Sequence, residues 1–208
     1  MIEYSHLTGD SQFDSLVTEG IVHQIGDYNA FMPPNQTKTL GNDDQSFWGL
    51  VAMTAAEVGR KDPANFTWLE AAKNVFDSQV VRWDNETCDG GLRWQIFSFN
   101  RGYEYKNSLS NGNFFLLAAR LASFTGNKTY AEWAERSYQW SVDIGLVDEK
   151  NYSVYDGSMT ETNCSSINKI QWSAAHGIYT EATAFMANFV STRASIASRA
   201  TLTILDWR

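Results

Sequence analysis

Apolar residues recur at helical spacing along most of the chain. In the segments 47–58, 69–83 and 114–121 they return every three or four positions, which places them on one face of a helix. A further face of the same kind runs through residues 130–144. No strand-length segment alternates convincingly between apolar and polar residues. The pattern predicts an all-α fold of about six helices, with residues 90–99 as a short hairpin or an extended loop.

The turns between these helices resemble one another. Residues 7–13, with Gly9 followed by Asp10, are echoed by residues 124–130, with Gly126 followed by Asn127. A looser copy contains Gly59. Each glycine suits the left-handed conformation that ends a helix, and the polar residues after it can cap the next helix. The repeat therefore predicts stacked antiparallel helical hairpins.

Three long loops separate the hairpins, at residues 26–41, 84–110 and 148–171. Loops longer than about 12–15 residues in a compact domain are usually functional or disordered. These loops contain too many aromatic residues for disorder. We expect them at one rim of the fold, where they would form a cleft.

Composition and motifs narrow the class of ligand. The chain has 208 residues, 43% of them hydrophobic, and a net charge of -8 without any cluster of Lys and Arg. This balance argues against nucleic acid and an anionic membrane surface as natural partners and favours a neutral ligand. Two Cys and three His argue against a structural zinc site, so we expect no metal. We also expect no cofactor, because the chain lacks a Walker loop, a dinucleotide-binding glycine pattern and a nucleophile elbow.

Several features point to the secretory pathway. Cys88 and Cys164 are compatible with one disulfide in an oxidising compartment, and equally with two buried thiols. The N-terminal residues are polar and form no signal peptide, and no apolar run approaches the ~18 residues that span a bilayer, so we expect that an N-terminal part is missing. Glycosylation acceptor sequences are more frequent than the roughly two or three expected by chance. They lie at Asn35, Asn65, Asn85, Asn127, Asn151 and Asn163.

Asp43 and Asp44 are adjacent at the start of a predicted helix, directly before Phe47 and Trp48. In one interpretation, Asn42 or Asp43 caps the helix and the second aspartate interacts with the helix dipole. In the other, neighbouring apolar surface raises the pKa of at least one carboxyl group. Glycoside hydrolysis needs one ionised and one protonated carboxyl group, and adjacency favours the separation of ~5–5.5 Å that a retaining mechanism uses. Local sequence alone leaves the two interpretations evenly balanced.

The loops also contain side chains that suit a sugar. Flat aromatic faces can pack on pyranose C–H groups, while amides and carboxylates can bind hydroxyl groups. Packing within the core or the loops is the alternative for any single aromatic residue. The predicted substrate-binding residues are Asn42, Trp94, Gln95, Tyr105, Asn107, Asn111, Asp156 and Trp172.

Five motifs, in order along the chain, resemble the fungal mannan endo-1,6-α-mannosidases of glycoside hydrolase family 76. They are residues 32–38, 41–45, 90–95, 106–108 and 155–157, and the resemblance runs from about residue 4 to about residue 187. It implies an (α/α)6 barrel of which only about half is present. It also implies a retaining mechanism in which Asp43 is the nucleophile and Asp44 the general acid/base.

The same resemblance implies a substrate and a location. The substrate would be α-mannan or the glycan of a GPI-anchored protein, with β-glucan as a candidate acceptor. The protein would act at the cell surface or cell wall, attached to the membrane only through a GPI anchor that this chain lacks. A truncated, non-catalytic mannan-binding protein is the alternative function.

The resemblance also divides the chain and leaves its cysteine pairing open. Residues 1–189 are assigned to a partial catalytic domain. Residues 190–208 form a divergent tail that is too short and too charged for a GPI signal. Many relatives have a cysteine at the position of Asn113, so the partner of Cys88 is not fixed. A Cys88–Cys164 bridge is one hypothesis.

Overall fold

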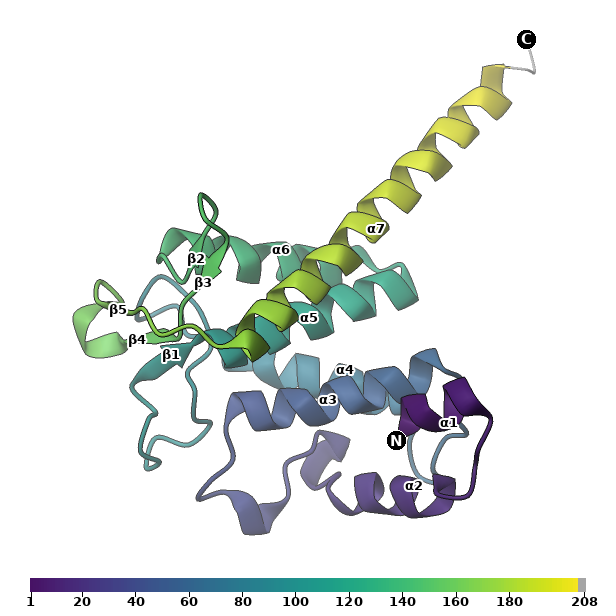
Figure 1. The fold of residues 1–208 in the computed structure, drawn as a ribbon, viewed down its shortest axis with the longest axis horizontal. Coiled ribbons are helices and arrows are strands. Elements are labelled where there is room, and N and C mark those ends of the chain that lie inside the picture. The colour runs from purple at the N-terminus through teal and green to yellow at the C-terminus, as the bar shows by residue number, and fades with distance from the viewer. Residues whose placement is uncertain (206–208) are drawn as a thin grey trace.

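Seven α-helices make up most of the part of the chain that the structure describes (Figure 1). The computed structural model describes the backbone of residues 1–205 and the side chains of residues 1–191. The all-α prediction is therefore confirmed, with one helix more than the expected number. The helices are α1 (Ile2–Thr8), α2 (Asp14–His23), α3 (Asn42–Glu57), α4 (Trp68–Val81), α5 (Ser108–Thr125), α6 (Lys128–Asp143) and α7 (Ser173–Leu205).

The repeated turns adopt the conformations that their sequences predict. Gly9 and Gly126 follow α1 and α5 with φ angles of 73° and 70°, in the left-handed region that suits glycine. The Asn127 side chain then caps α6 by accepting a hydrogen bond from the Thr129 N–H. At the start of α4, Thr67 and Glu70 form a reciprocal capping box. The predicted helix, turn, helix pattern is confirmed at these positions.

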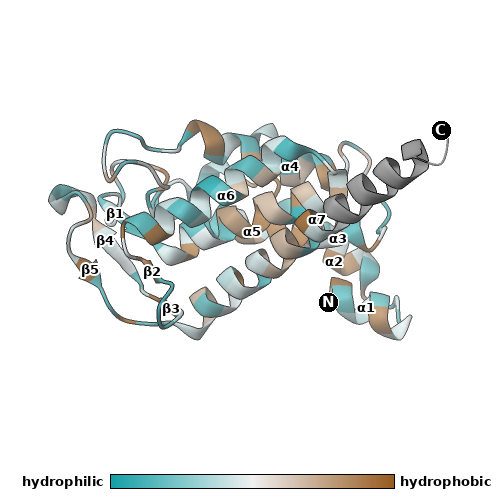
Figure 2. Ribbon diagram, turned by 90° about the horizontal axis from the view of Figure 1, so that it is seen from above, coloured by the Kyte–Doolittle hydropathy of each residue, from teal (hydrophilic) through white to brown (hydrophobic). Residues whose placement is uncertain are grey.

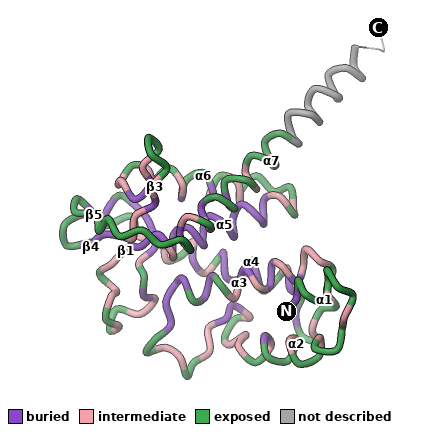
Figure 3. The backbone as a smooth tube through the Cα atoms, viewed as in Figure 1, coloured by how far each residue is buried: buried purple, intermediate pink, exposed green. Residues whose placement is uncertain are grey.

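Helix α5 lies at the centre of the molecule. It packs against α3, α6 and α7, while α4 packs against α3. Every residue from Ser110 to Ala122 is buried, and Figures 2 and 3 show the apolar and buried character of this helix. A helix that is apolar on all sides needs neighbours on all sides, which explains its central place. The N-terminal ends of α3 and α5 point to the same side of the molecule (Figure 1).

Large aromatic side chains join the outer helices to α5. Trp83 makes edge contacts with Trp133 and Trp140, at centroid distances of 5.6 and 5.8 Å. Phe76 of α4 stacks on Phe114 of α5 at 5.4 Å. Such pairs combine large apolar burial with specific geometry. They fix how α4 and α6 lie against the central helix.

Five short strands, which the periodicity did not predict, lie in the long loops. Their ranges are β1 (Tyr105–Asn107), β2 (Val147–Asp148), β3 (Ser153–Val154), β4 (Gly157–Met159) and β5 (Ile167–Asn168). They form a β1-β4-β5 sheet and a β2-β3 pair, all antiparallel. Two or three residues are too few for an alternating pattern to be visible. The loops also contain 3-10 turns at Asp27–Asn29, Pro34–Gln36 and Thr160–Thr162.

The three long loops meet, as predicted. Asn100 donates a hydrogen bond to the Thr37 carbonyl at 3.0 Å, which joins the first loop to the second. The N–H of Thr160 donates to the Glu104 carbonyl at 2.9 Å, which joins the third loop to the second. Residues 90–99 form an extended loop, not a hairpin, with one isolated bridge between Gly41 and Gln95. The loops thus make one continuous surface beside the start of α3.

The cysteine hypothesis is confirmed, because Cys88 and Cys164 form a disulfide. The six predicted glycosylation acceptors all lie in exposed positions; they are Asn35, Asn65, Asn85, Asn127, Asn151 and Asn163. Within the described residues, no helix is long and apolar enough to cross a membrane. Helix α7 runs without a break across residue 190, so the domain boundary at that position stays a prediction.

Candidate functional site

The structure corrects the capping interpretation, because the N-cap of α3 is Gly41 and neither Asn42 nor Asp43 caps the helix; Asp44 supplies the capping hydrogen bond instead. Helix α3 begins at Asn42, and the N–H of Gly41 donates a hydrogen bond to Asp44 Oδ2 at 2.8 Å. The carboxylate also lies in the first turn, where the helix dipole favours negative charge. Asp44 is exposed. It is thus held at the start of α3 with its side chain open to solvent.

Asp43 lies in a different environment from its neighbour. Only 9% of it is exposed. Its Oδ1 accepts a hydrogen bond from the Asp44 N–H at 3.0 Å, and its Oδ2 accepts one from Trp94 Nε1 at 3.1 Å. Burial, and then the charge of Asp44, raise the pKa of Asp43 to about 6. The predicted rise in pKa therefore applies to Asp43, while Asp44 has the predicted place in the first turn, near the helix dipole.

Trp94 reaches Asp43 because its backbone is held on two sides. Its N–H donates to the Tyr105 carbonyl at 2.6 Å, and its carbonyl accepts from the Asn42 N–H at 2.8 Å. The indole ring lies so close to Gly102 that a Cβ there would be 2.4 Å from Cε3. Gly102 also has a φ of 97°, which disfavours any other residue. Trp94 is 36% exposed, so part of the residue remains open to solvent although its indole N–H is bonded to Asp43.

A second group of predicted residues surrounds Asp156. Its Oδ2 accepts a hydrogen bond from the Tyr105 hydroxyl at 2.7 Å, and its Oδ1 accepts one from Trp172 Nε1 at 2.9 Å. Burial, followed by this contact with Asp156, raises the pKa of Tyr105 well above its usual value. Asn168, which sequence reasoning missed, also donates to Asp156 Oδ2 at 3.0 Å. Three predicted residues are therefore brought together here, and Trp172 is 52% exposed.

The four remaining predicted residues are buried and hold the backbone. Asn107 caps α5 by accepting from the Ser110 N–H at 3.1 Å. Asn111 binds the N–H and carbonyl of Leu92 at 2.7 and 2.9 Å. Gln95 Oε1 accepts from Asn100 Nδ2, while Asn42 is 1% exposed and bonded on both ends of its amide. For these residues the structure gives a positioning role, and contact with a substrate stays a prediction.

A buried polar layer, which the sequence analysis did not predict, lies between α3 and α4. Gln79 Nε2 donates to the Asn42 carbonyl at 3.0 Å and to Ser46 Oγ at 2.8 Å. Gln45 Nε2 donates to the Ala30 carbonyl at 2.7 Å, and Gln45 Oε1 accepts from Arg82. The signal in the sequence is that polar residues at 79 and 82 interrupt an apolar helix face. This layer holds the first turn of α3, which carries the aspartates.

Charged side chains hold the loop at residues 84–110, which contains Trp94. Lys106 is fully buried, and its Nζ donates to the carbonyls of Thr87 and Gly90 at 2.7 and 2.6 Å and lies 3.2 Å from Asp84 Oδ2. Burial lowers the pKa of Lys106 to about 8. Arg93 pairs with the same Asp84 oxygen at 3.0 Å. Burial alone would raise the pKa of Asp84, but its hydrogen bonds from Thr87 and the Glu86 N–H, together with the charge of Lys106, lower it to about 2.

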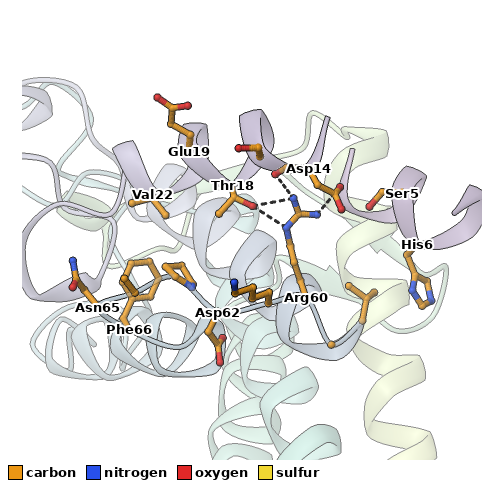
Figure 4. Close-up of a pocket in the computed structure, with 16 residues that line it drawn as sticks. Ser5, His6, Asp14, Thr18, Glu19, Val22, Arg60, Asp62, Asn65 and Phe66 are labelled. Carbon is orange, nitrogen blue, oxygen red and sulfur yellow. Dashed lines mark hydrogen bonds and ion pairs between the residues drawn. The ribbon is translucent and has the colours of Figure 1, made fainter. Parts of the chain in front are cut away.

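Two cavities border opposite ends of α3. A cavity of about 470 Å³ borders the polar layer and is lined by Asn42, Arg82, Gln95 and Tyr103, among others. A larger one, of about 950 Å³, lies beyond the C-terminal end of α3, where Arg60 binds Asp14 and Thr18 of α2 (Figure 4). A helix of this length separates its two ends by roughly 24 Å. The larger cavity is therefore remote from the aspartates.

Comparison with known proteins identifies the family. The sequence profile of Glycosyl hydrolase family 76 matches residues 1–201. The mannan endo-1,6-alpha-mannosidase DCW1 of Candida albicans is 47% identical over 91% of this chain and 42% of its own length. The DCW1 protein of Saccharomyces cerevisiae is 43% identical over 91% of this chain and 43% of its own length. The chain thus spans less than half the length of these relatives.

Solved structures agree with this match. Dfg5 from Chaetomium thermophilum, in complex with glucosamine, is 45% identical and superposes with a TM-score of 0.88, covering 91% of this chain and 47% of that one. The GH76A α-1,6-mannanase of Salegentibacter sp. HEL1_6 has a TM-score of 0.68 at 22% identity, over 88% of this chain and 50% of that one, which shows the fold alone. The helical hairpins described above therefore correspond to part of an all-α toroid, and the chain belongs to glycoside hydrolase family 76.

Proposed function

We propose that the protein is a retaining, endo-acting α-1,6-mannanase or mannan transglycosidase, with Asp43 and Asp44 as its catalytic pair. The observation that carries this proposal is the contrast between two adjacent carboxyl groups at one helix start. Asp43 is buried and bonded to Trp94, whereas Asp44 is exposed. Glycoside hydrolysis uses two carboxyl groups in different environments.

The relatives support the choice of reaction. The curated relatives are named mannan endo-1,6-alpha-mannosidases. A mannanase of the same fold, in which two adjacent aspartates are replaced, is described as inactive and is in complex with α-1,6-mannotetrose. Asp43 and Asp44 are the adjacent pair beside the partly exposed Trp94 in this chain.

The roles of the two aspartates follow the family resemblance. Asp43 would attack the anomeric carbon, and Asp44 would protonate the leaving oxygen and then deprotonate the incoming acceptor. A raised pKa such as that of Asp43, about 6, suits a proton donor, so its assignment as the nucleophile rests on the family resemblance; Asp43 is nonetheless mostly ionised at neutral pH. The hydrogen bonds from Trp94 and from the Asp44 N–H would orient its carboxylate. Trp94 and Trp172 would offer exposed aromatic faces to the sugar rings.

The substrate would be α-mannan or the glycan of a GPI-anchored protein, with β-glucan as an acceptor in cell-wall biogenesis. The protein would act in the secretory pathway or at the cell surface, and the six exposed glycosylation acceptors support this location. Its membrane attachment would use a GPI anchor. The alternative is a non-catalytic protein that binds mannan through the same loops.

Turnover of defined oligosaccharides tests the proposal. This chain and the full-length protein would each be incubated with α-1,6-oligomannosides, and cleavage and transfer products would be measured by mass spectrometry. We expect Asp44→Asn to abolish processing of natural linkages while sparing substrates with activated leaving groups. We expect Asp43→Ala to abolish covalent labelling by a mannose-configured trap. Binding without turnover in the full-length protein would favour the non-catalytic alternative, and labelling that survives Asp43→Ala would overturn the assigned roles.

A further inference from the structure

Arg82, which directly follows α4, is a partly buried cation with an unusual set of partners. Its Nε donates to Asn42 Oδ1 at 2.9 Å, and its Nη2 donates to Gln45 Oε1. Among the described residues, no carboxylate forms an ion pair with it. Burial lowers its pKa to about 10, so it remains charged at neutral pH. A partly buried charge without a counter-ion loses hydration and gains no ion pair, so stability alone does not explain its presence.

Both acceptors of Arg82 lie in the first turn of α3, on either side of the aspartates. Asn42 and Gln45 flank Asp43 and Asp44 in sequence. The planar guanidinium group donates from two nitrogens at a fixed separation and can therefore fix the positions of two acceptors. The ammonium group of a lysine, on a flexible stem, has no such rigid geometry. Arg82 therefore restrains the short segment that presents the two carboxyl groups.

Asn42 connects Arg82 to the backbone of residues 93 and 94. While Asn42 Oδ1 accepts from Arg82, its Nδ2 donates to the Arg93 carbonyl at 2.8 Å. The backbone N–H of Asn42 donates to the Trp94 carbonyl, also at 2.8 Å. Asn42 is therefore the link that sets residues 93 and 94 in register with the start of α3. The same register places Trp94 Nε1 within hydrogen-bond distance of Asp43.

We propose that Arg82 is a positioning residue of the site, which acts through Asn42 to keep Trp94 bonded to Asp43. The inference rests on the proposed function for its catalytic consequence, but the contacts themselves can be tested without turnover. A hydrogen bond to a carboxylate favours its ionised form. Loss of Arg82 leaves Asn42 Oδ1 without its donor, so Asn42 holds residues 93 and 94 less firmly against the start of α3. The hydrogen bond from Trp94 Nε1 to Asp43 then weakens. The ionised fraction of Asp43 then falls at a given pH.

Arg120 provides a matched control. Arg120 is a buried arginine that binds α3 at its C-terminal end. Its Nη2 donates to Glu57 Oε2 at 2.5 Å and to Thr54 Oγ1 at 2.8 Å. The experiment compares Arg82→Gln, Arg82→Lys and Arg120→Gln in the full-length protein. We measure kcat and KM on α-1,6-oligomannosides across pH, the melting temperature, and the indole N–H resonance of Trp94, assigned with Trp94→Phe.

We expect Arg82→Gln to lower kcat by about 10- to 100-fold with little change in KM, as for a misplaced catalytic group. The acid limb of its pH profile should move to higher pH, and the Trp94 resonance should shift. Arg82→Lys keeps the positive charge but loses the planar pair of donors, so we expect it to restore neither the pH profile nor the Trp94 resonance. Arg120→Gln should lower the melting temperature and leave kcat, the pH profile and the Trp94 resonance as in wild type.

Asn42→Ser gives an independent test if Arg82→Gln does not fold. It should reproduce the kinetic defect by itself. Where Arg82→Gln does fold, the double variant Asn42→Ser/Arg82→Gln should be no slower than Asn42→Ser alone, because both act through one path. A wild-type pH profile and Trp94 resonance in Arg82→Gln, or full rescue by Arg82→Lys, would overturn the proposal. An inactive wild-type protein would instead refute the proposed function, and the Trp94 resonance would still decide whether Arg82 holds the site.

Discussion

Trp94 Nε1 donates a hydrogen bond to Asp43 Oδ2 at 3.1 Å, although the two residues are 51 positions apart. Asp43 belongs to the first turn of α3, whereas Trp94 comes from the loop that leads to β1. The contact gives one of two adjacent carboxyl groups a neutral donor and an apolar neighbour. It therefore distinguishes the two aspartates chemically and underlies the first prediction.

Trp94→Phe keeps an aromatic face but removes the indole N–H. Because that hydrogen bond lowers the pKa of Asp43, its loss should raise the pKa above about 6. As a nucleophile Asp43 acts when ionised, so the acid limb of the kcat profile should move to higher pH by about 0.5–1 unit. The measurement is the pH dependence of kcat. A limb that moves to lower pH would contradict this role of Trp94.

Asp43→Asn should make the protein more stable at neutral pH. The folded-state pKa of Asp43, about 6, lies above the ordinary pKa of an aspartate, 3.8. Between these values the folded state binds more protons than the unfolded state, so wild-type stability falls as pH rises through this window. The side chain of the variant cannot ionise, so its free energy of unfolding does not fall in this way. The difference between the two proteins should be about 1–3 kcal/mol at pH 7.

Urea unfolding of Asp43→Asn and wild type at pH 4 and pH 7 measures this effect. The advantage of the variant should be present at pH 7 and largely lost at pH 4. Asp44→Asn serves as the comparison, since Asp44 is exposed and accepts a hydrogen bond that caps α3. We expect that change to be neutral or slightly destabilising at both pH values.

Removal of the Cys88–Cys164 disulfide should destabilise the protein by about 2–5 kcal/mol. The bridge closes a loop with a sequence separation of 76 and joins residues 84–91 to the turn after β4. The Cys88 N–H also donates to Asn163 Oδ1 at 2.6 Å, so both sides of the bridge are tied at this point. The double variant Cys88→Ala/Cys164→Ala should melt at the same temperature with and without dithiothreitol. Wild type should fall to that temperature only when dithiothreitol is present.

Asn113→Leu should stabilise the protein by about 1 kcal/mol. Asn113 lies fully buried in α5, and neither its Oδ1 nor its Nδ2 has a hydrogen-bond partner among the described residues. A leucine of similar size removes that unmet polarity. Asn111→Leu is the control, because the Asn111 amide makes bonds to Leu92 and Asn107 that a leucine cannot replace. Unfolding in urea should move the two variants in opposite directions, and a destabilised Asn113→Leu would count against the prediction.

The sequence alone determined the local structure of this protein. Apolar spacing located the helices, and the glycines at 9 and 126 located the left-handed turns between them, because both depend on neighbouring residues. The pair at Asp43 and Asp44 was visible for the same reason. Short strands such as β1 were not, since their pairing with β4 depends on residues about 50 positions away.

Only the tertiary structure decided which environment each functional side chain has. Adjacent aspartates look equivalent in sequence, but packing buries Asp43 beside Trp94 and leaves Asp44 exposed. Asn42 and Asn111 resemble sugar-binding amides, yet their side chains already bind the backbone groups of Arg93 and Leu92. Burial and hydrogen bonding between distant segments set these properties, because they depend on how helices and loops pack and not on the order of residues within any one of them.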